Sequence, residues 1–595
     1  MIRFFKRTAI FLTAVLMVLG AFGCNGQKAE EDKRNLSAAE FSVSNLTGTD
    51  AVGRKISPVS TKRKEKYVGI FYSFWLGQHP SLQRSINDIQ KILDSGQTFK
   101  LTDTSDSGQF YFWGEPLYGY YNMQDPWVLT RHVELLTNAG IDFICVDATN
   151  EHDYLEVGTK LLNILRKFAD QGFEVPKVCF YTNTSSGTTV KKIYQDYYAT
   201  HNEWIDLWFA PGGKPLIVGI TEKNGFASDQ TAFLGSRDFV SSELQRYFEV
   251  KESQWPNTKV NNDVAMPWMT WEYPQYIHNG FISVPVAQHS HTQTFVSSKS
   301  PECSRGYDNV DKRVAGDWRE GLSFQQMWDT VHNNRDDVNV VLVTGWNEWI
   351  AGKSETGQFV DVYNWEFSRD IEMMKGGYGD NFYLQLAKNI REFKYDGEKS
   401  YVFPEKTIDV NGDFVAEFEK VYAQYKDFAG DALARNFKNA AGTDVYTDDS
   451  NRNDITDIKV AHDKRNYYFL VQTKEDITAY NGTDENWMNL FIGNENGEIG
   501  FYEYNYVINR HPEENRTSLE HYENGSWKNA GYIDYKINGN SIVFVVPMDF
   551  VGKSADKTKI RFKACDNVTN ARDIMDYYVT GDCAPLGRLG YSYGN

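Results

Sequence analysis

The stretch VVLVTGWNEWIAGK, Val340–Lys353, decides most of what this sequence predicts. An apolar run of strand length ends at a glycine and is followed by Trp346, Asn347, Glu348 and Trp349. Barrels and open α/β sheets place their chemistry at the carboxyl ends of such strands. A carboxylate held between indoles loses hydration, so we expect the pKa of Glu348 to rise and the residue to do acid/base work. The alternative is a structural carboxylate that caps a loop or pairs with Lys353.

The same pattern repeats from Tyr67 to about residue 400. Helical segments separate eight apolar runs that read as strands, beginning at Tyr67, Ile141, Lys177, Lys214, Tyr247, Pro267, Phe281 and Val340. Asp125 is placed to cap one helix and Gly140 to end it. Alternation of strands and helices forces parallel pairing, so we predict an α/β fold: a (β/α)8 TIM barrel over residues 67–400.

Barrel topology would gather the residues that follow each strand on one rim. Asp147 and Glu348 are the catalytic candidates there, and the substrate-binding candidates are Trp75, His79, Asn150, Asn183, Glu252, Trp271, Glu272, His289, His291, Trp346, Asn347 and Trp349. Carboxylates that face one pocket from different strands are what glycoside hydrolysis needs. The alternative for Asp147 is a cap on the next helix. His289 and His291 would face the same way on an extended segment, and we expect them to bind substrate hydroxyls rather than a metal.

Two insertions lengthen the predicted rim, and loops of this length are usually functional. FYFWGEPLYGYYN follows the first strand and adds Glu115 as a catalytic candidate and Trp113 and Tyr120 as sugar-contacting ones. SRGYDNVDKR follows the seventh strand and adds Asp308. The alternatives are aromatic side chains that hold the loop on the barrel, and an ion pair between Arg305 and Asp308.

Composition narrows the choice of partner. The chain has 595 residues, 62 basic and 80 acidic, for a formal charge of -18, and such a surface repels phosphate backbones, so nucleic acid is excluded. Aromatic residues reach 15%, which suits saccharide stacking and equally a large barrel core. The length predicts two to four domains.

Residues 1–24 are typical of a lipoprotein signal peptide, with basic residues before a short apolar run that ends at Gly23 and Cys24. We expect Cys24 to carry the lipid, residues 25–66 to form a flexible tether, and the protein to be exported and anchored in a bacterial outer membrane. An ordinary secretory signal is the alternative. The other five cysteines contain no C-x-x-C pair, which argues against zinc, although Cys565 and Cys583 would be able to form a disulfide.

The GWNEW signature, the GYDN element at residues 306–309 and the barrel pattern resemble the glycoside hydrolase family 71/99 group and the related WbsX-type domains, over about Tyr67–Tyr395. In the family 99 endo-α-mannosidases, the Glu of this motif acts as a base and a second Glu three residues later as an acid. The resemblance gives Glu348 the first role, but the second position is Ala351. It therefore implies either a glycoside hydrolase that takes its second carboxylate from Glu115, Asp147, Glu272 or Glu355, or a domain that binds sugar without cleaving it.

Residues 401–595 show short alternating strand patterns between Asn, Gly and Asp turns, which predicts an all-β sandwich. The run IDVNGDFVAEFEKV, the element Arg452–Asp454 and Asp463 resemble the family 9 carbohydrate-binding module group, with Trp487 and Trp527 as possible sugar platforms. Oxygen ligands in DDSNRND, Asp448–Asp454, suit a structural calcium ion or are solvated turn residues. We expect no other cofactor; the glycan and the oligomeric state are not determined by the sequence.

Overall fold

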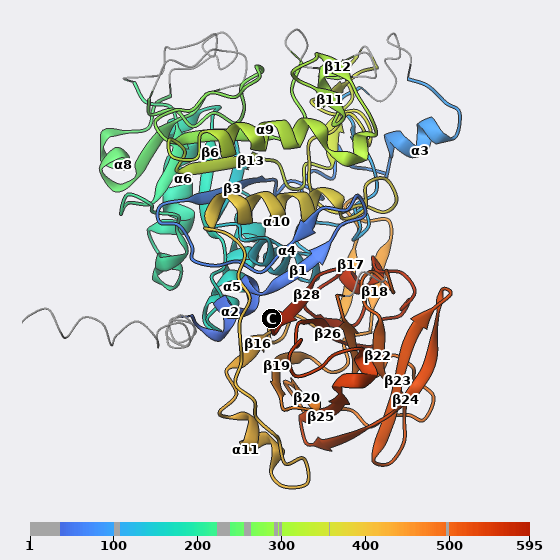
Figure 1. The fold of residues 1–595 in the computed structure, drawn as a ribbon. Helices are drawn as coiled ribbons and strands as arrows, with labels where there is room; N and C mark the ends of the chain where they lie inside the picture. The colour runs from blue at the N-terminus through green and yellow to red at the C-terminus, as the bar shows by residue number, and fades with distance from the viewer. Residues whose placement is uncertain are drawn as a thin grey trace, which may run out of the picture.

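The structure is a computed structural model that describes residues 36–99, 107–222, 238–254, 263–290, 295–296, 300–355, 357–495 and 499–595. Its first part is α/β and its second part is built from antiparallel strands (Figure 1). The described residues contain no helix that is long and apolar enough to cross a membrane.

Seven parallel strands form the sheet of the first part. In spatial order they are β8 (Glu249–Glu252), β7 (Leu216–Gly219), β6 (Lys177–Thr182), β5 (Phe143–Ala148), β3 (Tyr67–Tyr72), β13 (Val340–Thr344) and β9 (Phe281–Pro285). The helices that follow them are α4 (Pro126–Ala139), α5 (Leu155–Ala169), α6 (Ser186–Ile193), α8 (Ser242–Tyr247), α9 (Leu322–Asn333) and α10 (Asn381–Lys394). The α/β class and the parallel pairing that strand-helix alternation predicts are confirmed, but the closed (β/α)8 barrel is not: the described strands form a partial barrel in which β8 and β9 are edge strands that do not pair with each other.

The helix boundaries agree with the predicted signals at α4. The Asp125 carboxylate accepts a hydrogen bond from the backbone N–H of Trp127 at 3.1 Å, and Gly140 ends the helix with a φ of 84°. Neighbouring helices pack in the order α5, α4, α10 and α9 around the sheet.

Short elements in the loops are α3 (Ile89–Asp94), β4 (Phe110–Phe112), β10 (Phe295–Val296), β11 (Tyr307–Asp308), β12 (Arg313–Val314), β14 (Ile350–Gly352) and β15 (Phe359–Val360).

The sixth predicted strand, which begins at Pro267, does not form in the described residues 263–280. Ala265 makes a parallel bridge to Glu252 of β8, and the Ser283 hydroxyl of β9 donates to the carbonyl of Pro267 at 2.6 Å. Pro267 has no N–H to give to a ladder, and the N–H of Trp268 donates to the Tyr181 hydroxyl at 3.0 Å instead. The prediction of eight strands is therefore wrong by one, and an irregular segment lies between β8 and β9.

Antiparallel pairing dominates the C-terminal part. One continuous path runs through β16 (Ala423–Lys426), β19 (Ile455–His462), β20 (Asn466–Thr473), β25 (Ser541–Pro547), β24 (Ser526–Asn538), β23 (Arg516–Glu523), β22 (Tyr506–Pro512), β21 (Asn489–Gly493), β26 (Ile560–Asp566) and β28 (Gly590–Tyr593), with β27 (Asp582–Ala584) beside β26. The path folds back on itself, so that strands far apart along it come into contact. Tyr425 of β16 and Phe469 of β20 both pack on Phe562 of β26, with ring centroids 4.9 and 5.4 Å away. Cys565 and Cys583 face each other across β26 and β27 as free thiols.

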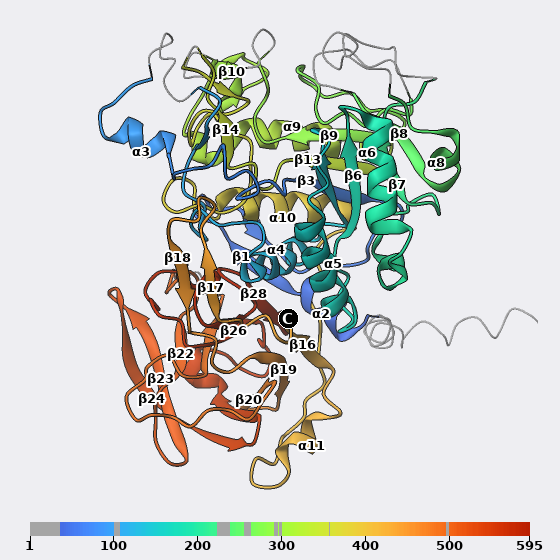
Figure 2. The same cartoon turned by 180° about the vertical axis from the view of Figure 1, so that it is seen from behind.

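The predicted flexible tether is wrong for residues 36–66, which are structured; residues 25–35 and Cys24 lie outside the described residues. Helix α2 (Ala38–Ser44) starts with a capping box between Ser37 and Glu40. Strand β1 (Leu46–Thr49) pairs with β28, and β2 (Lys55–Ile56) pairs with β1, so the N-terminal segment extends the C-terminal sheet. Figure 2 shows α2 and β1 in blue against the red and orange strands.

The two parts also meet through buried ion pairs. Arg435, in the hairpin of β17 (Arg435–Lys438) and β18 (Val445–Asp448), donates to Asp125 at 2.8 Å. Arg588 donates to Asp380 at 2.7 Å. Burying a charge without its partner costs free energy, so these pairs favour the relative placement of the two parts in which both charges are paired.

A chain shortened to begin at Tyr67 tests the correction at the N-terminus. It loses β1 and β2 together with the buried side chains Phe41, Leu46 and Ile56, and it uncovers the edge of β28. We expect lower soluble yield and a melting temperature about 5 °C or more below that of a chain beginning at Leu36. Equal melting temperatures for the two chains would restore the tether prediction.

Candidate active site

The GWNEW turn, residues 345–349, leaves the carboxyl end of β13 and is held by the segment 369–372. The Asp370 carboxylate accepts a hydrogen bond from the backbone N–H of Glu348 at 2.9 Å. The N–H of Glu372 donates to the carbonyl of Trp346 at 3.0 Å. A side chain on Gly345 would lie tightly against Asp370, whose Oδ1 is 3.1 Å from the position of a Cβ, so this close approach favours glycine. The turn is therefore a fixed platform for Glu348.

Glu348 is half-buried, and its pKa lies well above the usual value for a glutamate. Burial is the largest cause, and the charges of Asp361, Asp370 and Asp147 add to it against the opposing charge of Arg369. The predicted direction is confirmed, but tryptophans are not shown to be its cause. Glu348 therefore holds its proton far above the pH at which an exposed glutamate would lose it.

Asp361 has the opposite character. His289 Nε2 lies 2.9 Å from its Oδ1, and Arg369 Nη2 lies 3.7 Å away. Burial acts to raise the pKa of Asp361, but the hydrogen bond from His289 and the charge of Arg369 outweigh it and hold the pKa below the usual value. The Nδ1 of His289 faces the carbonyl of Ser290 at 2.9 Å, which fixes the orientation of the ring.

Two further aspartates complete the carboxylate group. Burial raises the pKa of Asp147, at the end of β5, and the charge of Asp361 adds to the effect; its Oδ1 accepts from the N–H and hydroxyl of Thr149 at 2.9 and 2.7 Å. Burial raises the pKa of Asp370 to about 6. The charges of these four carboxyl groups thus affect one another's pKa values. The groups are Asp147 of β5, Glu348 of the GWNEW turn, and Asp361 and Asp370 of the loop after it.

Aromatic side chains flank the carboxylates on two sides. Trp271 stacks on His289 with ring centroids 4.2 Å apart and planes inclined by 3°. On the β3 and β5 side, Trp75 packs edge-on against His79, whose Nε2 lies 2.7 Å from the hydroxyl of Tyr154. The charge of Asp147 adds to burial in raising the pKa of Tyr154, which places that phenol near the carboxylate group. Four predicted rim residues, Trp75, His79, Trp271 and His289, are thus near the site.

Several predicted sugar contacts are core residues instead. Trp346 packs against His132, while Trp349 stacks on Trp113 with centroids 4.2 Å apart. All three indoles are fully buried. Asn347 is also fully buried and bonds both the N–H and the carbonyl of Ser73, at 2.8 and 3.0 Å, which ties β13 to β3. Direct substrate contact by these four residues is therefore a wrong prediction.

Other candidates are engaged in local structure. The buried side chains of Tyr120, Asn183 and Glu252 bond Asp88, Ser253 and Thr221 respectively. Asp308 accepts from the N–H groups of Val310 and Asp311 in the β11–β12 turn. Glu272 is exposed and accepts from Tyr276, and Asn150 is exposed after β5. His291 lies outside the described residues.

Glu115 is paired with two lysines, at 2.5 Å from Lys91 and 2.7 Å from Lys375. Burial acts to raise its pKa, but the hydrogen bonds from Lys375 and Lys91 prevail and lower it. A carboxylate held ionised in this way is a poor proton donor, so the structure disfavours Glu115 as the missing acid.

Sequence reasoning missed Asp361, Arg369, Asp370 and Glu372. None of them follows a predicted strand, whereas the predicted candidates lie at strand ends or in the two long insertions. The available signal was the length of the connection between the GWNEW turn and the last helix, because long irregular loops in compact domains are usually functional. Asp361 also adopts a φ of 63°, a strained conformation for a residue other than glycine.

Ala351, at the position where the resemblance requires an acid, lies in β14 and pairs with Tyr111 of β4. It is 2% exposed and belongs to the hydrophobic core. A carboxylate at this position would be buried among apolar side chains. A catalytic pair that includes Glu348 would therefore need its second carboxylate from another part of the chain.

No family model matches this sequence, and no curated protein matches it. Among solved structures, the chain is similar to the GH99 endo-alpha-mannosidase from Bacteroides thetaiotaomicron in complex with BIS-TRIS-Propane, with 16% identity and a TM-score of 0.33 over 55% of this chain and 97% of that one. A second structure of that enzyme gives 15% identity and a TM-score of 0.34, with the same coverage. The comparisons do not support the resemblance of the C-terminal part to family 9 carbohydrate-binding modules.

The substitution Ala351→Glu tests whether this chain can accept the carboxylate that the resemblance requires. We expect it to destabilise the protein by about 3 kcal/mol, because an unpaired carboxylate would enter the core. Thermal denaturation measures the effect. Val314→Glu, at an exposed position of β12, is the matched control and should leave the melting temperature unchanged. Full stability of Ala351→Glu would mean that the position is open to the site.

Proposed function

We propose that this protein is a glycoside hydrolase in which Glu348 and Asp361 form the catalytic pair. The observation that carries the proposal is the opposite direction of their two pKa shifts at neighbouring positions on the rim of the sheet. Two carboxyl groups whose environments push their pKa values apart are suited to serve as acid and base in one reaction. Aromatic side chains beside them provide the stacking surface that sugar rings need.

In this mechanism the protonated Glu348 donates to the glycosidic oxygen as the bond to the leaving group breaks. The ionised Asp361 either attacks the anomeric carbon or activates a water molecule that does so. His289 and Arg369 keep Asp361 ionised, and Asp370 is a positioning residue that orients the backbone of Glu348. Asp147 adds negative charge beside an oxocarbenium-like transition state.

This assignment reverses the role that the family resemblance implied for Glu348. A base must be unprotonated at working pH, whereas the burial and the neighbouring carboxylates of Glu348 favour its neutral form. Asp361 is better suited to the basic role, since it has a histidine and an arginine beside it. The proposed pair is therefore Glu348 and Asp361, whereas the family pattern uses the positions of Glu348 and Ala351.

The C-terminal part is proposed to bind the same glycan. A cavity of about 720 Å³ is lined by Trp527, Tyr522 and Phe501 together with polar side chains that include Arg510 and Asn486. This mixture of ring faces and hydrogen-bonding groups suits a saccharide. Trp487 does not share this role, because it is 1% exposed and its indole donates to the carbonyl of Thr478 at 2.9 Å.

Export and a lipid anchor on Cys24 remain part of the proposal and rest on the N-terminal sequence. A non-catalytic glycan-binding protein is the second candidate, and the observation in its favour is Ala351. Calorimetric binding of a polysaccharide without release of reducing ends on long incubation would favour the second candidate.

Glu348→Gln tests the proton donor. The variant keeps the shape of the side chain and the backbone hydrogen bond to Asp370, so we expect it to fold normally and to lose about 10²- to 10⁴-fold in kcat/KM. Reducing-end release from a panel of α- and β-linked polysaccharides first identifies the substrate and then measures the loss. Glu419→Gln, an exposed carboxylate of the C-terminal part that directly follows the helix α11 (Phe414–Phe418), is the control and should keep full activity. Full activity of Glu348→Gln would reject its assigned role.

His289→Phe tests how Asp361 is kept ionised. The phenyl ring can still stack on Trp271, but the hydrogen bond that lowers the pKa of Asp361 is gone, so that pKa rises. Since Asp361 must be ionised, the acidic limb of the kcat/KM profile should move to higher pH. His521→Phe, whose histidine contacts Glu523 on β23, should leave the profile in place. An unchanged acidic limb in His289→Phe would remove Asp361 from the mechanism.

A further inference from the structure

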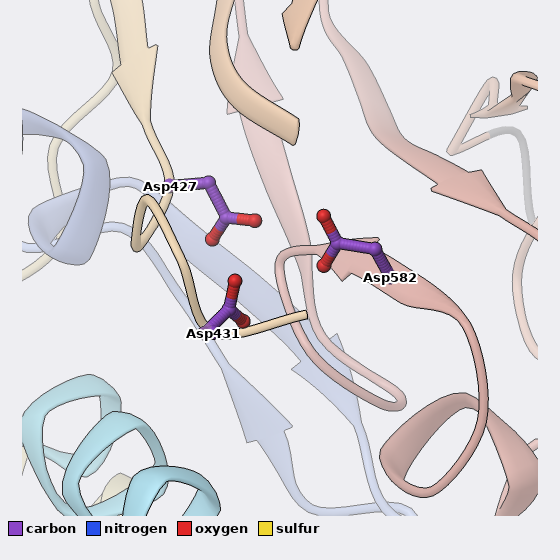
Figure 3. Close-up of side chains that lie close together, drawn as sticks. All are labelled: Asp427, Asp431 and Asp582. Carbon is purple, nitrogen blue, oxygen red and sulfur yellow. The ribbon is translucent and has the colours of Figure 1, made fainter. Parts of the chain in front are cut away.

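Three buried aspartates converge where the C-terminal part meets the barrel. Asp427 directly follows β16, Asp431 lies in the turn after it, and Asp582 begins β27. Figure 3 shows their carboxyl groups pointing toward one another. One oxygen from each lies within 4.8 Å of the others, and the three residues are 3%, 0% and 1% exposed. Residues far apart in the chain thus form one cluster of carboxylate oxygens.

Some oxygen atoms of these three carboxyl groups lack a hydrogen-bond partner among the described residues. Asp431 accepts from Arg131 at 3.1 Å, and Asp582 accepts from the backbone N–H of Ile455. Within the described part of the chain, however, Oδ2 of Asp427, Oδ1 of Asp431 and Oδ1 of Asp582 have no hydrogen-bond partner. Buried polar atoms in native proteins are nearly always paired, so each of these oxygens requires an explanation.

A fourth side chain from the other part of the molecule points to the same place. Glu134, on α4 of the barrel, is fully buried, and its carboxyl group lies within hydrogen-bonding reach of that of Asp431. Its Oε2 accepts from Arg131 at 3.3 Å, whereas its Oε1 has no hydrogen-bond partner among the described residues. The negative charge of Glu134 also acts on Asp427.

The balance of charge makes a ligand the simplest explanation. Arg131 forms ion pairs with Glu134 and Asp431 at 3.3 and 3.1 Å, and the charge of Lys167 also acts on Asp431. Two cationic side chains thus face four buried carboxyl groups. Like charges this close raise one another's energy in a medium of low dielectric constant. Either protons or a bound cation must neutralise the remainder.

We propose that Asp427, Asp431 and Asp582 bind a divalent cation, Ca²⁺ in preference to Mg²⁺, with Glu134 facing the site from α4. The donors are all carboxylate oxygens, which are ligands for hard cations and not for the thiolate- and imidazole-binding metals. Ca²⁺ accepts several protein oxygens in a flexible geometry, whereas Mg²⁺ demands near-octahedral geometry and usually keeps several waters, so a buried group of protein carboxylates suits Ca²⁺ better.

The proposed ion would join the two parts of the molecule. Asp427, Asp431 and Asp582 come from the antiparallel part, and Arg131 on α4 contacts both Asp431 and the carbonyl of Gly581, at 3.1 and 3.3 Å. The site differs from the calcium site considered from sequence in Asp448–Asp454. There Asp448 bonds Ser450, and Arg452 pairs with Asp566 and Asp484.

The experiment uses the full chain after treatment with EDTA. Isothermal titration calorimetry with CaCl₂ and, separately, MgCl₂ measures stoichiometry and affinity, and thermal denaturation measures stabilisation. We expect one Ca²⁺ per chain, weaker Mg²⁺ binding, and a melting temperature about 3 to 10 °C higher when Ca²⁺ exceeds Kd about 100-fold.

The variants Asp427→Asn and Asp582→Asn should bind Ca²⁺ at least about tenfold more weakly, because each loses a charged ligand. Without Ca²⁺ they should be as stable as the parent or more stable, since a repelling charge is removed; with Ca²⁺ the order should reverse. Asp449→Asn, an exposed carboxylate of the Asp448–Asp454 segment, is the matched control and should bind Ca²⁺ as the parent does.

Absence of binding heat and of any thermal shift with both cations would overturn the proposal and show that protons neutralise the cluster. Unchanged Ca²⁺ affinity in both aspartate variants would also overturn it, by placing the ion elsewhere. Should these variants not fold, Glu134→Gln, a change on the barrel side, replaces them: weaker Ca²⁺ binding supports the site, and unchanged binding together with an unchanged thermal shift rejects it.

Discussion

The hydrogen bond from the backbone N–H of Glu348 to the carboxylate of Asp370 is the constraint on which the proposed site depends. Asp370 and Glu372 are two residues apart in the segment 369–372, and both bond the GWNEW turn. Asp370 holds the backbone of Glu348. The carboxylate of Glu372 accepts from the indole of Trp349 and from the hydroxyl of Tyr121, and it contacts His132 at 2.9 Å. The catalytic candidate is thus fastened directly to the hydrophobic core.

Burial of carboxyl groups has different consequences in the two acidic clusters of this molecule. At the rim, Glu348 and Asp361 are partly exposed, and His289 and Arg369 lie beside one of them, so the two pKa values diverge. At the junction of the two parts, Arg131 faces four fully or almost fully buried carboxyl groups, and burial raises the pKa values of Asp427, Asp431 and Asp582 together. Divergent values suit proton transfer, whereas a collective excess of negative charge suits cation binding.

The successful predictions share a local cause. Apolar runs produced the strands of the sheet, with the Pro267 segment as the exception, and the signals at Asp125 and Gly140 predicted the limits of α4. Residues that directly follow parallel strands, such as Asp147 and Glu348, lie at one edge because strand direction alone puts them there. The failures concern side-chain direction. Trp346 and Trp349 flank Glu348 in sequence but turn into the core, and the N-terminal strands β1 and β2 bury apolar residues against a sheet formed by the far end of the chain.

The sequence by itself determined the class of each part, the position of Glu348 at a strand end and the absence of an acid at Ala351, because these depend on periodicity and on residue identity. Only the tertiary structure decided which groups stand beside Glu348. Asp361, Arg369 and Asp370 belong to a loop without periodicity, and Asp427 and Asp582 come from distant segments. Their pKa values and possible ligands depend on burial and on charges brought together through space, and neither quantity is encoded in the spacing of residues along the chain.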